Sequence, residues 1–156
     1  MALSRPKQPE LLRARILEAA QGVLLDEGLA AVTHDRVLAR TGISKGGLQH
    51  HFRTKQLLLD ALFDQLFAGF VAQYELALAQ EPAGPARRMR AYIKASRANA
   101  LDVARTGRAT VLLALGDEQY QARWSRFLDE ALSADTLDAG TLLACRLAAD
   151  GLWYSL

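Results

Sequence analysis

The stretch from Thr33 to Lys55, which reads THDRVLARTGISKGGLQHHFRTK, constrains the fold more than any other part of the sequence. Thr33, Ser44 and Thr54 are residues that commonly cap helices, because their hydroxyls accept a hydrogen bond from a backbone N–H of the first turn. Gly42 lies between the first two of these helices, and a residue without a Cβ tolerates the positive φ of a sharp turn. The pattern predicts a helix-turn-helix, a module whose second helix enters the DNA major groove.

The rest of the sequence favours an all-α fold with two domains. Hydrophobic residues make up 51% of the 156 residues, so the chain can bury a core, and it has only four prolines. We expect one helix from Pro9 and three more that follow the caps Thr33, Ser44 and Thr54. A helix over about 86–106 comes next, followed by a shorter one that ends at about 116, one over about 117–131 and a last one from about 137 onwards. We expect an N-terminal helix-turn-helix domain over residues 1–53 and a C-terminal helical bundle over residues 54–156.

Charge and targeting signals narrow the class of protein. Residues 1–60 carry nine Lys or Arg and six Asp or Glu, whereas residues 61–156 carry ten and eleven. This small excess of basic residues falls on the predicted helix-turn-helix domain, as attraction to the phosphates of DNA requires. The N-terminus has no apolar stretch typical of a secretory signal, and no apolar run reaches the ~20 residues of a membrane span. The single cysteine, Cys145, is expected to be a core residue, and the protein to be cytoplasmic.

The predicted second helix of the motif supplies the candidate DNA-contacting residues. Those expected to face solvent are Lys45, Gly46, Gly47, Gln49, His50 and His51, and Thr33 at the preceding cap joins them. The paired glycines cost helix propensity, roughly 1 kcal/mol each relative to alanine. Either the backbone approaches a DNA strand closely at this point, or the glycines allow tight packing against the first helix.

For Gln49 and Lys55 the sequence predicts a specific contact with DNA, but each could also be an ordinary surface residue. The amide of Gln49 can both donate to and accept from the edge of adenine in the major groove, although an exposed glutamine can equally be an ordinary surface residue. Lys55, in the first turn of the next helix, is expected to contact phosphate at the edge of the groove. A solvated surface lysine is the alternative for Lys55.

Metal and catalytic sites are not predicted. His50 and His51 are adjacent and so point about 100° apart on a helix, and no cysteine or carboxylate stands at ligand spacing from His34 or from them. The sequence contains no phosphate-binding glycine loop, no nucleophile elbow and no HExxH motif. We therefore expect neither a cofactor nor an enzymatic activity.

The run from Gly42 to Lys55, followed by Leu57 and Leu58, resembles the N-terminal signature of the TetR family of transcriptional regulators. The resemblance covers about residues 11–62. It implies an all-helical homodimer whose reading heads bind a palindromic double-stranded DNA operator. It also implies a larger C-terminal domain that holds a small-molecule effector and forms the dimer interface.

Matched by position, Gly47, Gln49 and His51 fall where the family touches bases or phosphates, and Lys45 and Lys55 where it touches the backbone. The chain departs from the family at three positions: Gln49 replaces a usual tyrosine, Gly47 a frequent threonine or serine, and Leu38 a usual small alanine. The closing segment, residues 146–153, resembles the start of the family's dimerisation helices. Because family members continue for about one more helix, we expect this sequence either to be shortened or to lack its C-terminal end.

The C-terminal domain supplies candidates for the effector site and the interface. Candidate effector contacts are Phe63, Phe67, Phe70, Tyr74, Met89, Tyr92, Leu112, Trp124 and Phe127, and the alternative for each of them is plain core packing. The apolar last helix needs a covering surface, which a two-fold helical bundle would provide. Its interface candidates are Leu143, Leu147, Trp153 and Tyr154.

The sequence favours a ligand-responsive repressor, and two proteins of other classes remain as alternatives. A helical interaction protein could keep the fold and lose operator binding, and the departure at Gln49 favours that reading. A small helical enzyme would need a polar cluster with catalytic spacing inside the body. Salt-sensitive, sequence-specific DNA binding discriminates the repressor from both.

Overall fold

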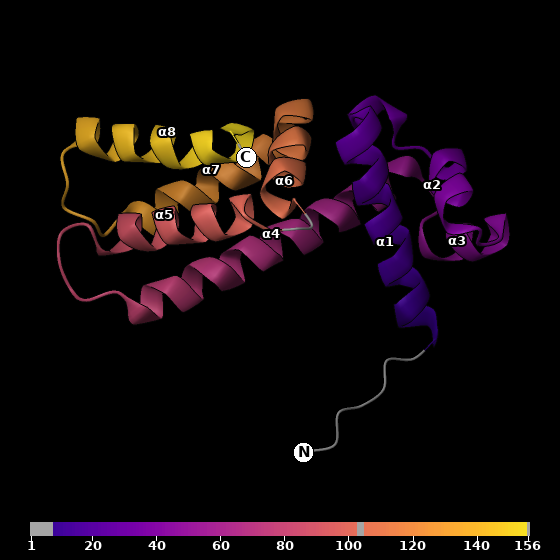
Figure 1. Ribbon diagram of the computed structural model, residues 1–156, viewed down its shortest axis with the longest axis horizontal. Helices are drawn as coiled ribbons and strands as arrows, with labels where there is room; N and C mark the ends of the chain where they lie inside the picture. The colour runs from indigo at the N-terminus through magenta and orange to yellow at the C-terminus, as the bar shows by residue number, and fades with distance from the viewer. Residues whose placement is uncertain (1–7, 103–104, 156) are drawn as a thin grey trace, which may run out of the picture. The chain divides into compact units, whose positions relative to one another are not determined.

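The computed structural model describes residues 8–102 and 105–155, except for the side chains of residues 154 and 155. The described residues form helices and contain no β-strand, which confirms the all-α prediction (Figure 1). The elements are α1 (Gln8–Glu27), the 3₁₀ helix η1 (Leu29–Ala31), α2 (His34–Thr41), α3 (Lys45–His51), α4 (Lys55–Gln80), α5 (Arg87–Ala100), α6 (Thr106–Gly116), α7 (Glu118–Leu132) and α8 (Ala139–Ser155). The chain divides into two compact units, Met1–Asp64 and Gln65–Leu156, so the division falls within α4.

The first unit is built on the contact between α1 and α2. One face of α1 is fully buried, with its apolar residues three and four positions apart, as a helix that covers a core requires. This core consists of Ile16, Leu17, Ala20, Val23, Leu24, Val32, Val37, Leu48, Phe52, Leu58, Leu59, Leu62 and Phe63. Outside the core, Arg36 pairs with Glu27 at 2.6 Å and Arg40 pairs with Asp26, so two cations of α2 are neutralised by the end of α1.

The turn between α2 and α3 has the geometry expected from its glycine. Gly42 adopts φ 64° and ψ 13°, the left-handed region in which a side chain would be strained. Its backbone N–H donates to the carbonyl of Leu38 at 3.0 Å, and the hydroxyl of Thr41 donates to the carbonyl of Val37 at 2.9 Å. These two bonds close the end of α2, and the chain reverses into α3.

In the second unit, α5 packs along α8 and α6 packs against α7 (Figure 1). The prediction of one helix over about 86–106 was wrong, because α5 ends at Ala100 and α6 begins at Thr106. Gly107, which directly follows the end expected for that helix, lies inside α6 and is buried. A Cβ there would meet Trp153 Cδ1 at 2.9 Å and the carbonyl oxygen of Asn99 at 3.2 Å. Gly107 therefore permits a close approach of backbone to side chain.

An aromatic cluster forms the core of the second unit. Phe70 lies at its centre, with its ring centroid 4.7 Å from that of Trp124, 5.8 Å from that of Tyr92 and 5.7 Å from that of Trp153. These edge-to-face contacts are the arrangement that aromatic quadrupoles favour. Cys145 is half-buried and packs against the same cluster.

Candidate nucleic-acid interface

Two caps and two anchors fix α3, the predicted reading helix. The hydroxyl of Ser44 accepts a hydrogen bond from the N–H of Gly47 at 3.1 Å, and the hydroxyl of Thr54 accepts from the N–H of Leu57 at 3.1 Å at the start of α4. Leu48 is completely buried and Phe52 almost so. Because Leu48 points into the core, the opposite face of α3 is left to solvent.

The solvent face of α3 carries most of the residues that the sequence assigned to DNA contact. Lys45, Gly46, Gln49 and His50 are exposed, whereas Gly47 and His51 are half-buried. The two imidazole rings meet edge to face, with centroids 5.4 Å apart. Amide, ammonium and imidazole groups thus share one short surface with exposed backbone, a combination that can donate to and accept from base edges and phosphates.

The two glycines of α3 have different surroundings. A Cβ on Gly46 would meet no atom within 4 Å. A Cβ on Gly47 would lie 3.2 Å from the Ser44 hydroxyl oxygen and 3.7 Å from Leu12 Cδ2 in α1. The tight contact at Gly47 is therefore with the cap of α3 itself, the contact with α1 is an ordinary van der Waals distance, and neither gives a reason for Gly46.

Thr33 and Lys55, also assigned to DNA contact, make local contacts. The hydroxyl of Thr33 accepts a hydrogen bond from the N–H of Arg36 at 3.3 Å and so caps α2. The ammonium of Lys55 donates to the carbonyls of Leu29 at 3.4 Å and Ala30 at 3.1 Å. Lys55 is exposed, but these bonds tie it to η1 and give it a structural role beside the predicted one.

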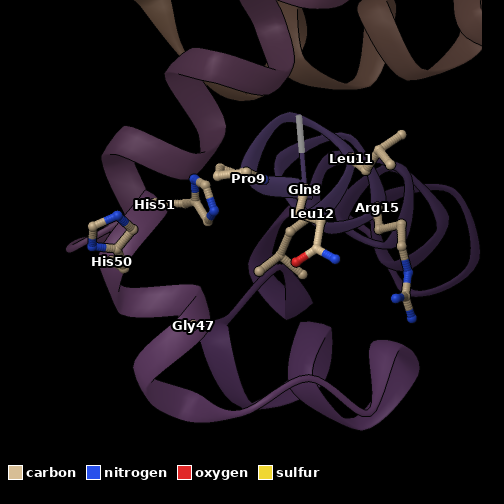
Figure 2. Close-up of a pocket in the computed structure, with 8 residues that line it drawn as sticks. All are labelled: Gln8, Pro9, Leu11, Leu12, Arg15, Gly47, His50 and His51. Carbon is tan, nitrogen blue, oxygen red and sulfur yellow. The ribbon is translucent and has the colours of Figure 1, made fainter. Parts of the chain in front are cut away.

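A groove of about 570 Å³ opens between the first turns of α1 and the second half of α3. Figure 2 shows its lining, with His50 and His51 on one side and Leu11 and Arg15 on the other. Gln8, Pro9, Leu12 and Gly47 complete it. The groove joins the exposed imidazoles to a second helix, so the candidate interface is wider than α3.

Helix α1 also contributes to this surface, which was not predicted from the sequence. Arg15 is exposed, and its guanidinium donates to the carbonyl of Thr41 at 3.3 Å, which connects α1 to the end of α2. Leu11 is 50% exposed although it lies on a helix that otherwise covers a core. Leu11 and Arg15 lie four residues apart and so share one face of α1. This spacing was the feature of the sequence from which their common surface could have been predicted.

The residues expected to contact an effector are mostly core residues of the second unit. Phe70, Tyr74, Met89 and Tyr92 are at most 1% exposed, and the Tyr74 hydroxyl donates to the carbonyl of Ala131 at 2.9 Å. Phe67 and Phe127 pack against the same cluster, Leu112 is half-buried, and Phe63 is buried in the first unit. Trp124 both belongs to the core and lines a cavity of about 160 Å³.

The residues expected at a dimer interface separate into two groups. Leu143 and Leu147 on α8 are 56% and 61% exposed, as an uncovered interface requires. Trp153, expected on the same surface, is instead 4% exposed, and its indole donates to the carbonyl of Ser96 at 3.0 Å. The side chain of Tyr154 lies outside the described residues. The exposed face of α8 is thus centred one to three turns before Trp153.

Two other kinds of feature do not occur within residues 8–102 and 105–155. No three His, Cys, Asp or Glu side chains gather there as metal ligands would. None of the described helices combines the length and the apolar character that a membrane-crossing helix needs.

Comparison with known proteins matches both units of the chain. Residues 16–62 match the family model of bacterial regulatory proteins of the tetR family, and residues 86–156 match that of the tetracyclin repressor-like C-terminal domain. The HTH-type transcriptional repressor KstR2 of Mycolicibacterium smegmatis is 30% identical over 78 residues, which is 50% of this chain and 38% of the relative. The match therefore spans about two fifths of that relative's length. With a model of the same family on each unit, the chain belongs to the tetR family of bacterial regulatory proteins.

Proposed function

We propose that this protein is a ligand-responsive transcriptional repressor that binds a palindromic DNA operator as a homodimer and acts in the cytoplasm. The observation that carries the proposal is the capped helix α3, whose apolar side is buried through Leu48 while Lys45, Gln49 and His50 are exposed. A helix held in this way can enter a major groove without losing its core contacts. The relative KstR2 is an HTH-type transcriptional repressor, which supports the same function for this protein.

Each exposed group of α3 has a role in the proposal. Gln49 reads a base edge, Lys45 contacts a phosphate near the start of the helix, and the N–H groups around Gly46 approach the DNA backbone. His50, His51 and Arg15 contact phosphates along the groove between α1 and α3. Two such heads in a dimer read half-sites about 34 Å apart.

The ligand response follows from a difference in affinity between two states of the dimer. A small molecule held in the C-terminal unit favours a separation of the heads that no longer fits adjacent grooves. It can do so only if it binds that state more tightly than the DNA-bound state.

The competing function is that of a helical interaction protein. Gln49, where the family usually has tyrosine, favours it, as does the engagement of Lys55 with the carbonyls of η1. Such a protein would show weak, sequence-independent DNA binding.

Selection of bound sequences from a random duplex pool, at near-physiological salt, tests the proposal. We expect a palindromic sequence to be enriched, and absence of enrichment by the folded protein would favour the interaction protein. Gln49→Ala should relax the preference at one operator position by ~1–3 kcal/mol. An unchanged preference would make Gln49 an ordinary surface residue.

A matched pair of lysine variants tests the phosphate contacts. Lys45→Ala and Lys55→Ala should each weaken binding to all sequences about equally and reduce the salt slope by about one. Lys55→Ala should also lower the melting temperature, because it removes the bonds to Leu29 and Ala30, whereas Lys45→Ala should not. Salt slopes equal to that of the parent would contradict the phosphate role of the lysine concerned.

A further inference from the structure

A cavity of about 160 Å³ lies between α6, α7 and α8 of the second unit. Its lining includes Trp124 and Trp153, which are the only tryptophans in the sequence. Apolar cavities of about 150 Å³ accommodate one benzene molecule, so this volume suits a ligand with a single ring. The size of the cavity therefore limits the ligand to a small molecule.

The two tryptophans form fixed walls. The Trp153 indole N–H donates to the carbonyl of Ser96 at 3.0 Å, which holds the ring in place. The centroid of Trp124 lies 5.4 Å from that of Trp153, with the ring planes 67° apart. Both rings are already held in place without a ligand, so binding would immobilise few side chains and lose little conformational entropy.

Two charged side chains, Asp150 and Arg146, also line the cavity. Asp150 is half-buried, and one of its oxygens, Oδ1, accepts a hydrogen bond from the hydroxyl of Tyr92. The other oxygen, Oδ2, lies 3.7 Å from Arg146 Nε, which is too long for a hydrogen bond. Burial raises the pKa of Asp150, since the charged carboxylate is incompletely compensated in this environment.

The balance of these groups favours a cationic ligand over an anionic one. Arg146 is one-third exposed and meets Asp150 only as a loose pair four residues away along α8, an arrangement of small energetic value. An ammonium group can displace it, bond Oδ2 directly and lie near the electron-rich faces of the indoles. A carboxylate ligand would instead be brought next to Asp150.

We propose that this cavity is the effector site and that it takes a small organic cation, an amine or amidine on a single ring, with its charged group at Asp150. The effector role deepens the proposed ligand response and rests on it. The ring occupies the cavity that Trp124 and Trp153 line, and Asp150, held by Tyr92, provides the counter-charge.

Because both tryptophans line the cavity, intrinsic fluorescence reports on it directly. Benzylammonium, benzyl alcohol and benzoate form a series with one ring and three charges, and each is titrated against the full chain without DNA. We expect a saturable change with benzylammonium, and dissociation constants at least tenfold weaker for the other two. Tighter binding of benzoate, or no saturable change with any of the three, would overturn the proposal.

Two variants locate the binding site. Asp150→Asn keeps an oxygen for the Tyr92 hydroxyl but removes the charge, so benzylammonium should bind at least tenfold more weakly. Arg146→Gln removes the competing cation, so binding should be as tight as in the parent or tighter. Unchanged affinity in Asp150→Asn, or loss of binding in Arg146→Gln alone, would contradict the assignment, and the ligand series on the unaltered chain does not depend on any variant folding.

The same measurements separate this proposal from the proposed function. Fluorescence titration needs no DNA, and the duplex selection needs no ligand. If benzylammonium binds but no duplex is enriched, the cation site stands and the repressor function fails. If a palindrome is enriched but no cation binds, the repressor stands and this effector site fails.

Discussion

At the scale of single residues, Gly46 and Gly47 show that neighbouring glycines can be required for different reasons. Gly47 lies where a Cβ would press on the Ser44 hydroxyl oxygen at 3.2 Å, the atom that caps α3. Gly46 has open space around its Cα within the described chain, so the protein's own packing does not require a glycine there. The close approach to DNA that we propose for α3 would supply a reason for a glycine at this position.

Alanine substitutions at the two glycines should therefore give opposite results. Gly46→Ala should raise the free energy of unfolding by roughly 0.5–1 kcal/mol, because alanine favours a helix and meets no clash. The same variant should bind operator DNA more weakly. Gly47→Ala, the matched control, should gain no stability, since the added methyl crowds the cap. Chemical denaturation and DNA titration measure both quantities, and full DNA affinity in Gly46→Ala would remove the backbone-approach role.

At the scale of elements, the local chemistry of caps and turns could be predicted from the sequence. Thr33, Ser44 and Thr54 each cap the helix they were expected to cap, and Gly42 takes the left-handed conformation. These features depend on residues within three positions of each other, so a single sequence contains the information. The helix-turn-helix could therefore be predicted correctly, because the contacts that define it join residues close in sequence.

What could not be predicted depends on contacts distant in sequence. Gly107 resembles a helix stop, but its role is set by Trp153, 46 positions away, which approaches the backbone of α6. Leu57 is apolar and yet 49% exposed, because apolar type alone does not decide burial. The Asp150–Arg146 pair at the cavity was also missed, although these are the only charged residues within α8.

The connection between α4 and α5 contains a charged residue that joins the two helices. Glu81 is 6% exposed, and its carboxylate accepts from Arg90 Nε at 2.7 Å and pairs with Lys94, both on α5. The hydrogen bond from Lys94, followed by that from Arg90, lowers the pKa of Glu81 below its ordinary value of 4.5. The ionised form is thus the form that stabilises this connection.

The contribution of Glu81 to stability should depend on pH in one direction. A carboxyl whose pKa is lower in the folded than in the unfolded protein stabilises the fold above the unfolded pKa and loses this effect as pH falls through the folded one. The difference in unfolding free energy between the parent and Glu81→Gln should therefore be largest above pH 4.5 and shrink on acidification. Denaturant unfolding at several pH values measures it, and a difference that grows towards acid would contradict the pairing.

At the scale of the whole molecule, the exposed face of α8 is where we place the interface of the proposed homodimer. Leu143 and Leu147 lie on it four residues apart, and small exposed residues, namely Gly140, Ala144 and Ala148, lie between and beside them. The opposite face of the helix is buried through Ala149 and Trp153. A helix that is apolar on both faces suits burial on both, and small residues allow a second helix to approach closely. A second copy of the chain meets this requirement with a self-complementary surface.

Introduction of a negative charge on this apolar face tests the dimer and its link to DNA binding. Leu147→Glu should convert a sedimenting dimer into a monomer, because two carboxylates would be buried without partners at a two-fold interface. Leu76→Glu on α4 is the matched control, since Leu76 is 57% exposed and Leu147 61% exposed. The control should remain a dimer. A monomer loses the paired half-site contacts, so Leu147→Glu should also lose preference for a palindrome over a single half-site. A variant that still sediments as a dimer would place the interface on another surface.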